Sequence, residues 1–467
     1  MTSPSRKFRL SAQSRKALRA TGFLLAILIG FQLVGLSLVI GAEMVPDRFV
    51  ADALVEGIEE GLITEVEHPI TGLGNQVDRW TECIALTIGL GDPDGSNNLQ
   101  TAITSPVIGK CGLTVPALRA YGDGASLEAN GSYFRYWHGY TFMTRPSLAL
   151  FGVAGTRIIA LALAAVALAS LAVLVGRVTS VAAALLLITP VLVSTDFVDL
   201  GESVPHALAM AATLASASLA WVIVRRRPSL FWMAAAALFA GSLSAFVDLM
   251  VFLPGTWALV SVVILVAALT RGWRSFRLLT AGIVAVTAWL VGLAFTWGTK
   301  WFLAGATVGF RTVFVNIRDQ VGFRLNGDST TVTEGFGAAT RLNVGYWLDR
   351  PLGTMIVLAS LAAAVFFVIR GVRSGRMSGW TALILAAPAF IPLVWYEILS
   401  SHSQIHYWIT YKSLGLALGA LLFGLFVAMR PPQHRTPSSD VIDLREPHEV
   451  SETARTPARI PDAEVHS

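Results

Sequence analysis

Charged residues are scarce in this sequence, and their scarcity excludes most soluble folds. Asp, Glu, Lys and Arg make up 14% of the 467 residues, while 54% are hydrophobic; a soluble domain carries about a quarter charged residues. The mean hydropathy is +0.62. The apolar residues form runs of roughly 18 or more, the length that crosses about 30 Å of hydrocarbon. The sequence therefore predicts an all-α integral membrane protein.

Cysteine is nearly absent, and the common catalytic motifs are missing. Only Cys83 and Cys111 occur, and a disulfide between them is permitted if their segment lies outside the cytoplasm. No phosphate-binding Walker loop, HExxH zinc motif or GxSxG nucleophile motif is present, so nucleotide and zinc chemistry have no support. No cofactor is predicted, and a divalent metal is compatible with the sequence but not implied by it.

The net charge of +5 reflects membrane topology rather than nucleic-acid binding. Ten spans are predicted at about 21–40, 149–175, 179–195, 204–224, 229–247, 253–270, 278–297, 353–370, 379–398 and 409–429. Arginines follow every second span, and cytoplasmic loops carry such residues. These arginines are Arg177, Arg225, Arg226, Arg227, Arg271, Arg274, Arg277, Arg370, Arg373, Arg376 and Arg430. The pattern predicts a multi-pass membrane protein with both termini cytoplasmic, and the resemblance given below implies the bacterial plasma membrane.

The polar segments divide the chain into parts. Residues 1–20 form a basic cytoplasmic N-terminus, 21–430 the transmembrane region, and 431–467 a tail without apolar periodicity, which we expect to be disordered. Two long outer loops are predicted at 43–147 and 298–351. Apolar stretches in the first loop, 83–90 and 113–118, could form helices lying on the bilayer.

Two basic and aromatic clusters flank predicted spans on the outer side. The first lies in 132–146 and contains Arg135, His138 and Arg145; the second lies in 402–412 and contains His402, His406, Tyr411 and Lys412. An interfacial aromatic belt explains the aromatic residues, and snorkelling explains Lys412. A phosphate-binding site explains the cations together, because guanidinium groups bind phosphate bidentately.

Several carboxylates could act as a proton acceptor. Asp78 and Glu82 are four residues apart and would share one face of a helix. They are also two of fourteen acids in this loop and could simply be solvated. Glu43 and Asp47, at the exit of the first span, form a second pair. Asp248, between two spans, is either a turn residue or an acid that lines a cavity.

Three segments resemble the GT-C glycosyltransferase superfamily of bacterial surface-polysaccharide enzymes. They are Tyr133–Gly139 with Arg145–Pro146, Phe246–Asp248 and His402–Lys412. The resemblance implies a helical bundle, a large first outer loop with a catalytic acid, and a polyprenyl-phosphate sugar donor. Many members carry adjacent acids after the first span, whereas Glu43 and Asp47 are separated, and this difference favours Asp78 or Glu82 as the catalytic acid.

The expected function is glycosyl transfer at the outer face. The resemblance implies a polyprenyl-phosphate sugar donor and a glycan or glycolipid acceptor. Arg135, His138, Arg145, Asp248, His402, His406, Tyr411 and Lys412 are predicted to bind substrate, without a metal. The alternative is a transporter or flippase for a lipid-linked or anionic solute, which would place ionisable residues deep within the spans.

Overall fold

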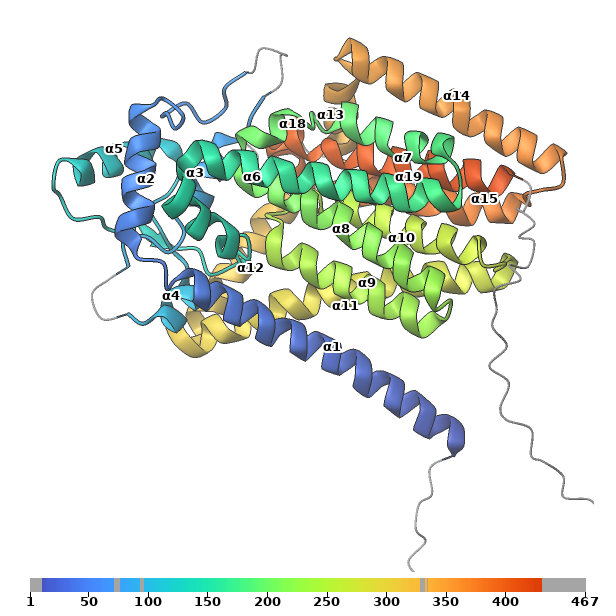
Figure 1. Ribbon diagram of the computed structural model, residues 1–467, viewed down its shortest axis with the longest axis horizontal. Coiled ribbons are helices and arrows are strands. Elements are labelled where there is room, and N and C mark those ends of the chain that lie inside the picture. The colour runs from blue at the N-terminus through green and yellow to red at the C-terminus, as the bar shows by residue number, and fades with distance from the viewer. Residues whose placement is uncertain (1–10, 71–75, 93–95, 328–331, 334, 431–467) are drawn as a thin grey trace, which may run out of the picture. The chain divides into compact units, whose positions relative to one another are not determined.

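The computed structural model describes residues 11–70, 76–92, 96–327, 332–333 and 335–430 (Figure 1). Within these residues the fold is almost entirely helical. Eight helical segments are long and apolar enough to cross a membrane: 16–42, 141–178, 204–226, 230–247, 276–308, 351–373, 379–398 and 407–429. The prediction of an all-α protein with membrane-spanning helices is therefore confirmed, whereas the predicted number of ten spans is not.

The helices of the bundle extend beyond several of the predicted spans. They are α1 (Ala12–Ala42), α6 (Thr141–Val178), α7 (Val181–Ser194), α8 (Val204–Arg226), α9 (Leu230–Val247), α10 (Leu253–Leu269), α11 (Ser275–Val308), α14 (Pro351–Arg373) and α19 (Lys412–Met429). Two predicted spans correspond to the shorter helices α7 and α10. At 1.5 Å per residue, these two rise only about 21 and 26 Å.

The core of the bundle is α10. Every residue from Leu253 to Leu269 except Trp257 is buried, as expected of a helix that is apolar on all sides. Helix α10 packs against α8, α11 and α19, and α19 also packs against α7. By contrast, α1, α6 and α14 leave most of their apolar windows uncovered, so these are the helices with surface available to lipid.

The first predicted loop is a folded subdomain at one end of the bundle. It contains α2 (Asp47–Glu59), α3 (Arg79–Leu86), α4 (Asn98–Thr104) and α5 (Cys111–Gly122), and the strands β1 (Pro106–Val107) and β2 (Gly131–Ser132) pair antiparallel. The expectation that 83–90 lies on the bilayer is wrong, because all eight of these residues are buried within the protein. The second stretch, 113–118, falls within α5.

The second predicted loop is also mostly helical. Helix α11 continues to Val308, past the predicted end at 297, and is followed by α12 (Phe310–Asn326) and α13 (Ala338–Leu348). The last stretch before α19 is interrupted: α15 (Gly379–Ala386), the 3-10 turn η2 (Ala387–Phe390) and α16 (Ile391–Ile398) are followed by α17 (Ser400–Ile405) and α18 (Tyr407–Thr410). A second 3-10 turn, η1 (Asp199–Glu202), precedes α8.

The arginine-bearing helix ends lie together, opposite the subdomain. Arg430 donates to the carbonyl of Thr179, and Arg225 donates to the hydroxyl of Thr270. The start of α1 and the end of α19 also lie at the end of the bundle away from α2, α3 and α5 (Figure 1). The predicted tail, 431–467, lies outside the described residues.

Helices α9 and α11 approach closely because glycines face the neighbouring backbone. A Cβ atom on Gly292 would lie 2.1 Å from the carbonyl oxygen of Leu238, and one on Gly241 would lie 2.0 Å from that of Trp289. Small residues allow this kind of contact between membrane helices.

We predict that Gly292→Ala destabilises the protein while Gly298→Ala does not. The added methyl group at position 292 forces the two helices apart, at a cost of about 1–3 kcal/mol for overpacking. Gly298 lies on the same helix with no atom within 4 Å of an added Cβ. Thermal melting of the purified variants measures the difference, and equal melting temperatures would contradict the close contact.

Candidate active site

A buried pair of charges fixes α3 to the bundle. The guanidinium of Arg157, on α6, donates from Nη2 to Oε2 of Glu82 at 2.6 Å and from Nε to Oε1 at 3.1 Å. Glu82 is only 1% exposed and also accepts from the backbone N–H of Val204. Since a buried ion pair leaves an uncompensated charge when one partner is lost, this pair is a strong constraint on where α3 lies.

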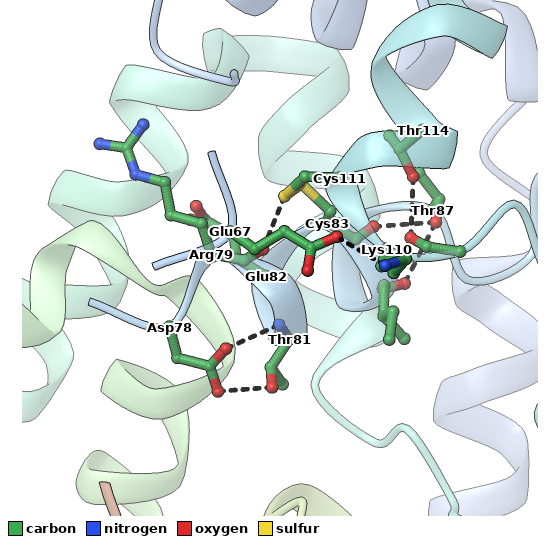
Figure 2. Close-up of a disulfide and its surroundings, with 12 residues drawn as sticks. Glu67, Asp78, Arg79, Thr81, Glu82, Cys83, Thr87, Lys110, Cys111 and Thr114 are labelled. Atoms are coloured by element: carbon green, nitrogen blue, oxygen red, sulfur yellow. Dashed lines mark hydrogen bonds and ion pairs between the residues drawn. A yellow bond between two sulfur atoms is a disulfide. The ribbon is translucent and has the colours of Figure 1, made fainter. Parts of the chain in front are cut away.

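Asp78 caps α3 and reaches α8. Its carboxylate accepts from the backbone N–H of Thr81 at 2.9 Å and from the Thr81 hydroxyl at 2.5 Å (Figure 2). It also accepts from Nε2 of His206 at 3.0 Å. Burial acts to raise the pKa of Asp78, but the bonds from His206 and Thr81 outweigh it and the pKa is lowered. Asp78 is therefore an ionised carboxylate held beside the bundle.

A disulfide connects α3 with α5. Cys83, on α3, is bonded to Cys111 at the start of α5 (Figure 2). Both cysteines are buried. The bond ties the helix that presents Asp78 and Glu82 to the remainder of the subdomain.

A cavity of about 60 Å³ opens beside Asp78, with room for several water molecules. Its lining comes from the first subdomain, from the turn between α9 and α10, from α12 and from the α17–α18 segment. The residues are Asp78, Trp80, Thr81, Ile84, Tyr133, Tyr136, Leu249, Val251, Arg324, His402, His406, Ile409 and Thr410. One carboxylate, one guanidinium and two imidazoles thus meet around one space.

Arg324 is the cation of this cavity. Its Nη2 donates to the Tyr136 hydroxyl at 2.7 Å, and its Nη1 lies 2.9 Å from Nδ1 of His402. A guanidinium can only donate, so Nδ1 of His402 accepts and the proton of the neutral ring belongs on Nε2. These two partners hold the guanidinium in the cavity wall.

The two histidines of the cavity are neutral in the folded protein. Burial lowers the pKa of His402 well below 6.5, and the neighbouring His406 and Arg324 lower it further. Burial lowers the pKa of His406 to about 4, although the Asp78 carboxylate acts in the opposite direction. Within the described residues, no hydrogen bond to the His406 side chain is seen, so its imidazole is available to a ligand.

The first predicted cluster reaches the cavity through its tyrosines rather than its cations. Arg145 is 1% exposed and pairs with Asp47 at 2.5 Å and Glu43 at 3.4 Å. His138 contacts the Tyr140 hydroxyl and the Tyr133 carbonyl, each at 2.8 Å. Arg135 lies over the Tyr133 ring. Of the three, none lines the cavity.

The remaining predicted residues hold the structure around the cavity. Asp248 accepts from the backbone N–H groups of Val251 and Phe252, each at 2.8 Å, and burial raises its pKa to about 6 despite these bonds. Tyr411 and Lys412 both reach Asp196, which lies between α7 and η1, at 2.5 and 3.5 Å. The cavity lining does not include Asp248, Tyr411, Lys412 or Glu82.

Two residues of the site were missed by sequence reasoning. Arg324 is one of several arginines in 298–351, and nothing in its local pattern separates it from the others. His206 lies within the predicted span 204–224, and its partner Asp78 lies 128 positions away in the sequence. A pairing between residues so far apart leaves no recognisable pattern in the sequence around either residue.

No family model, curated protein or solved structure matches the chain. The fold itself defines a helical protein with membrane-span-like helices, a folded subdomain between the first two of them, and a polar cavity where that subdomain meets the bundle. No group of three or more His, Cys, Asp or Glu side chains suited to a metal ion occurs among the described residues.

We predict that the disulfide contributes to stability. The bridged residues are 28 positions apart, and closing a loop of that length contributes roughly 3 kcal/mol by chain-entropy arithmetic. The Cys83→Ser/Cys111→Ser double variant should melt at a lower temperature than the unreduced protein and at the same temperature as the reduced protein. Reaction of both thiols with a maleimide in unreduced, denatured protein would refute the bond.

Acidification should destabilise the fold. The pKa of His138 is lowered by burial to about 3, and the pKa values of His402 and His406 are lowered as well. The unfolded chain binds more protons at these three histidines. Asp248 and Glu43, whose pKa values burial raises to about 6 and about 7, bind protons in the folded protein and offset part of this difference. Because the three histidines outnumber the two carboxyls, the free energy of unfolding falls as the pH drops below about 6.5. Melting temperatures between about pH 7.5 and pH 5 test this. His138→Gln should flatten the dependence, and a melting temperature that rises on acidification would contradict the prediction.

Proposed function

We propose that the protein is a glycosyltransferase of the bacterial plasma membrane. It moves a sugar from a polyprenyl-phosphate donor to a glycan or glycolipid acceptor on the outer face. The observation that carries this proposal is the cavity, in which the Asp78 carboxylate lies in one lining with Arg324, His402 and His406. Transfer of this kind needs a proton acceptor for the incoming hydroxyl and cations or donors for the phosphate that leaves.

Arg324 is the phosphate-binding residue in this proposal. Its bonds to Tyr136 and His402 use Nη1 and Nη2, and a guanidinium has five N–H donors in a fixed fork. The remaining donors can bind phosphate oxygens. His406 adds a neutral imidazole, and an anionic phosphate beside it would favour its protonation. The cavity volume suits a phosphate group, with the sugar and acceptor beyond it.

Asp78 is the favoured proton acceptor, and Glu82 takes a positioning role. Asp78 lines the cavity, whereas the oxygens of Glu82 are occupied by Arg157 and by the Val204 N–H. The lowered pKa of Asp78 keeps it ionised. Its existing bonds to Thr81 and His206 also orient it, so a hydroxyl that approaches from the cavity meets a fixed carboxylate.

The rival function, a transporter or flippase, has less support. Two ionisable residues within the spans lie toward helix ends: His206 is the third residue of α8, and Lys412 is the first of α19. Arg157 lies farther inside α6, but it is paired with Glu82 of the subdomain. Lys300, near the end of α11, is bonded to the Ala102 carbonyl and the Ser105 hydroxyl of the subdomain. Transport pathways instead place such groups near the bilayer midplane.

We predict a split between two kinds of variant. Arg324→Ala should weaken binding of the polyprenyl-phosphate sugar about 10-fold or more, since a hydrogen bond to a charged group contributes about 1.5–3 kcal/mol. Asp78→Asn should abolish transfer while leaving donor binding nearly intact, because the base acts on the transition state. Arg119→Ala, an exposed arginine paired with Glu65 on the subdomain surface, is the matched control.

The measurements are donor binding and glycosyl transfer by purified protein in nanodiscs, with melting temperatures to confirm folding. His406→Gln provides a second variant of the cavity lining, and it leaves Asp78, the N-cap residue of α3, unchanged. Donor that crosses the bilayer of proteoliposomes without transfer would favour the rival function. Unchanged donor binding by Arg324→Ala would contradict the proposal that this cavity binds the donor phosphate.

A further inference from the structure

Helix α12 presents two different faces. Its inward face carries Val313, which is 3% exposed, Ile317 and Arg324, and Arg324 reaches the cavity. These residues lie four, seven and eleven positions apart and therefore share one side of an α-helix. The helix packs against α11 and α17 through this side.

The neighbouring side of α12 carries an exposed apolar stripe. Phe310, Phe314, Val321 and Leu325 are 57%, 68%, 42% and 37% exposed. With 3.6 residues per turn, these positions fall within about 60° of one another around the helix axis. Val315 and Phe323 are also exposed but lie outside the stripe. A soluble surface would not leave such a row uncovered.

The stripe continues the apolar surface of a membrane-span-like helix. Phe302, on α11, is 64% exposed, and its ring centroid lies 5.6 Å from that of Phe310. Gly305 leaves the space that the Phe310 ring occupies, since an added Cβ would lie 2.4 Å from that ring. Gly309, with φ +97°, allows the chain to leave α11 and begin α12. Lipid that covers α11 at Phe302 would therefore meet Phe310 next.

We propose that α12 is docked on the outer leaflet of the bilayer through the stripe of Phe310, Phe314, Val321 and Leu325. The exposed Arg311 beside the stripe suits the phosphates of lipid head groups. Interfacial helices of this kind bury their apolar face roughly 5–10 Å below the head groups. The docked lipid covers the side of α12 next to the one that carries Arg324, and it thereby fixes the helix beside the cavity. This placement rests on the geometry of α12 alone, while its effect on donor binding rests on the proposed function.

Depth-dependent quenching tests the docking. Single cysteines at positions 314, 321 and 319 are labelled with a small fluorophore in nanodiscs, and nitroxide-bearing lipids serve as the quencher. The native cysteines give no background because they are bonded to each other. Asp319, on the same helix and 57% exposed at its side chain, is the matched control. Quenching at 314 and 321 should be severalfold stronger than at 319.

Other outcomes would overturn the proposal. Equal quenching at all three positions means that α12 stands clear of the bilayer. Protection of position 314 from both lipid and water-soluble quenchers means that a second protein chain covers the stripe. The Phe314→Asp/Val321→Asp variant should lose the lipid quenching of a label at 325 and weaken donor binding. If wild-type protein binds no donor, the proposed function fails, but the quenching comparison still decides the docking.

Discussion

The buried ion pair between Glu82 and Arg157 is the constraint on which the site depends. It joins α3, from the subdomain, to α6, from the bundle, and both side chains are largely removed from solvent. Losing one partner of such a pair costs about 3–5 kcal/mol, because the other charge stays buried. The hydrogen bond between Asp78 and His206 also connects α8 to α3 beside this ion pair. The carboxylate of the cavity is placed by these contacts.

The cavity forms where four separate parts of the chain meet at this junction, and three of them supply its polar side chains. The subdomain supplies Asp78 and Tyr136, α12 supplies Arg324, and the segment before α19 supplies His402 and His406. Arg324 bonds to members of both other parts, so its position depends on all three. A polar site of this composition at the end of an apolar bundle can bind an anionic head group while the attached chain stays in lipid. This combination supports the proposed polyprenyl-phosphate donor.

Several cations that suggested phosphate binding instead stabilise the fold. Arg145 binds the carbonyls of Ala42 and Val45 and pairs with Asp47. It thereby ties the start of α6 to the end of α1. Lys412 and Tyr411 reach Asp196 and connect α19 with the segment after α7. In each case a buried cation was satisfied by a carboxylate from a distant segment, which a reading of the local pattern could not include.

The sequence by itself determined the class of helical protein with membrane-spanning segments and the position of most apolar helices. It did so because hydrocarbon demands long apolar runs that satisfy their own backbone hydrogen bonds. It also singled out Asp78, His402 and His406, which line one cavity. Only the tertiary structure decided that Glu82 is paired, that Arg324 replaces Arg135 and Arg145 beside them, and that 298–351 is mostly helical. Those outcomes depend on contacts between residues far apart in the sequence, and no local periodicity or composition encodes such contacts.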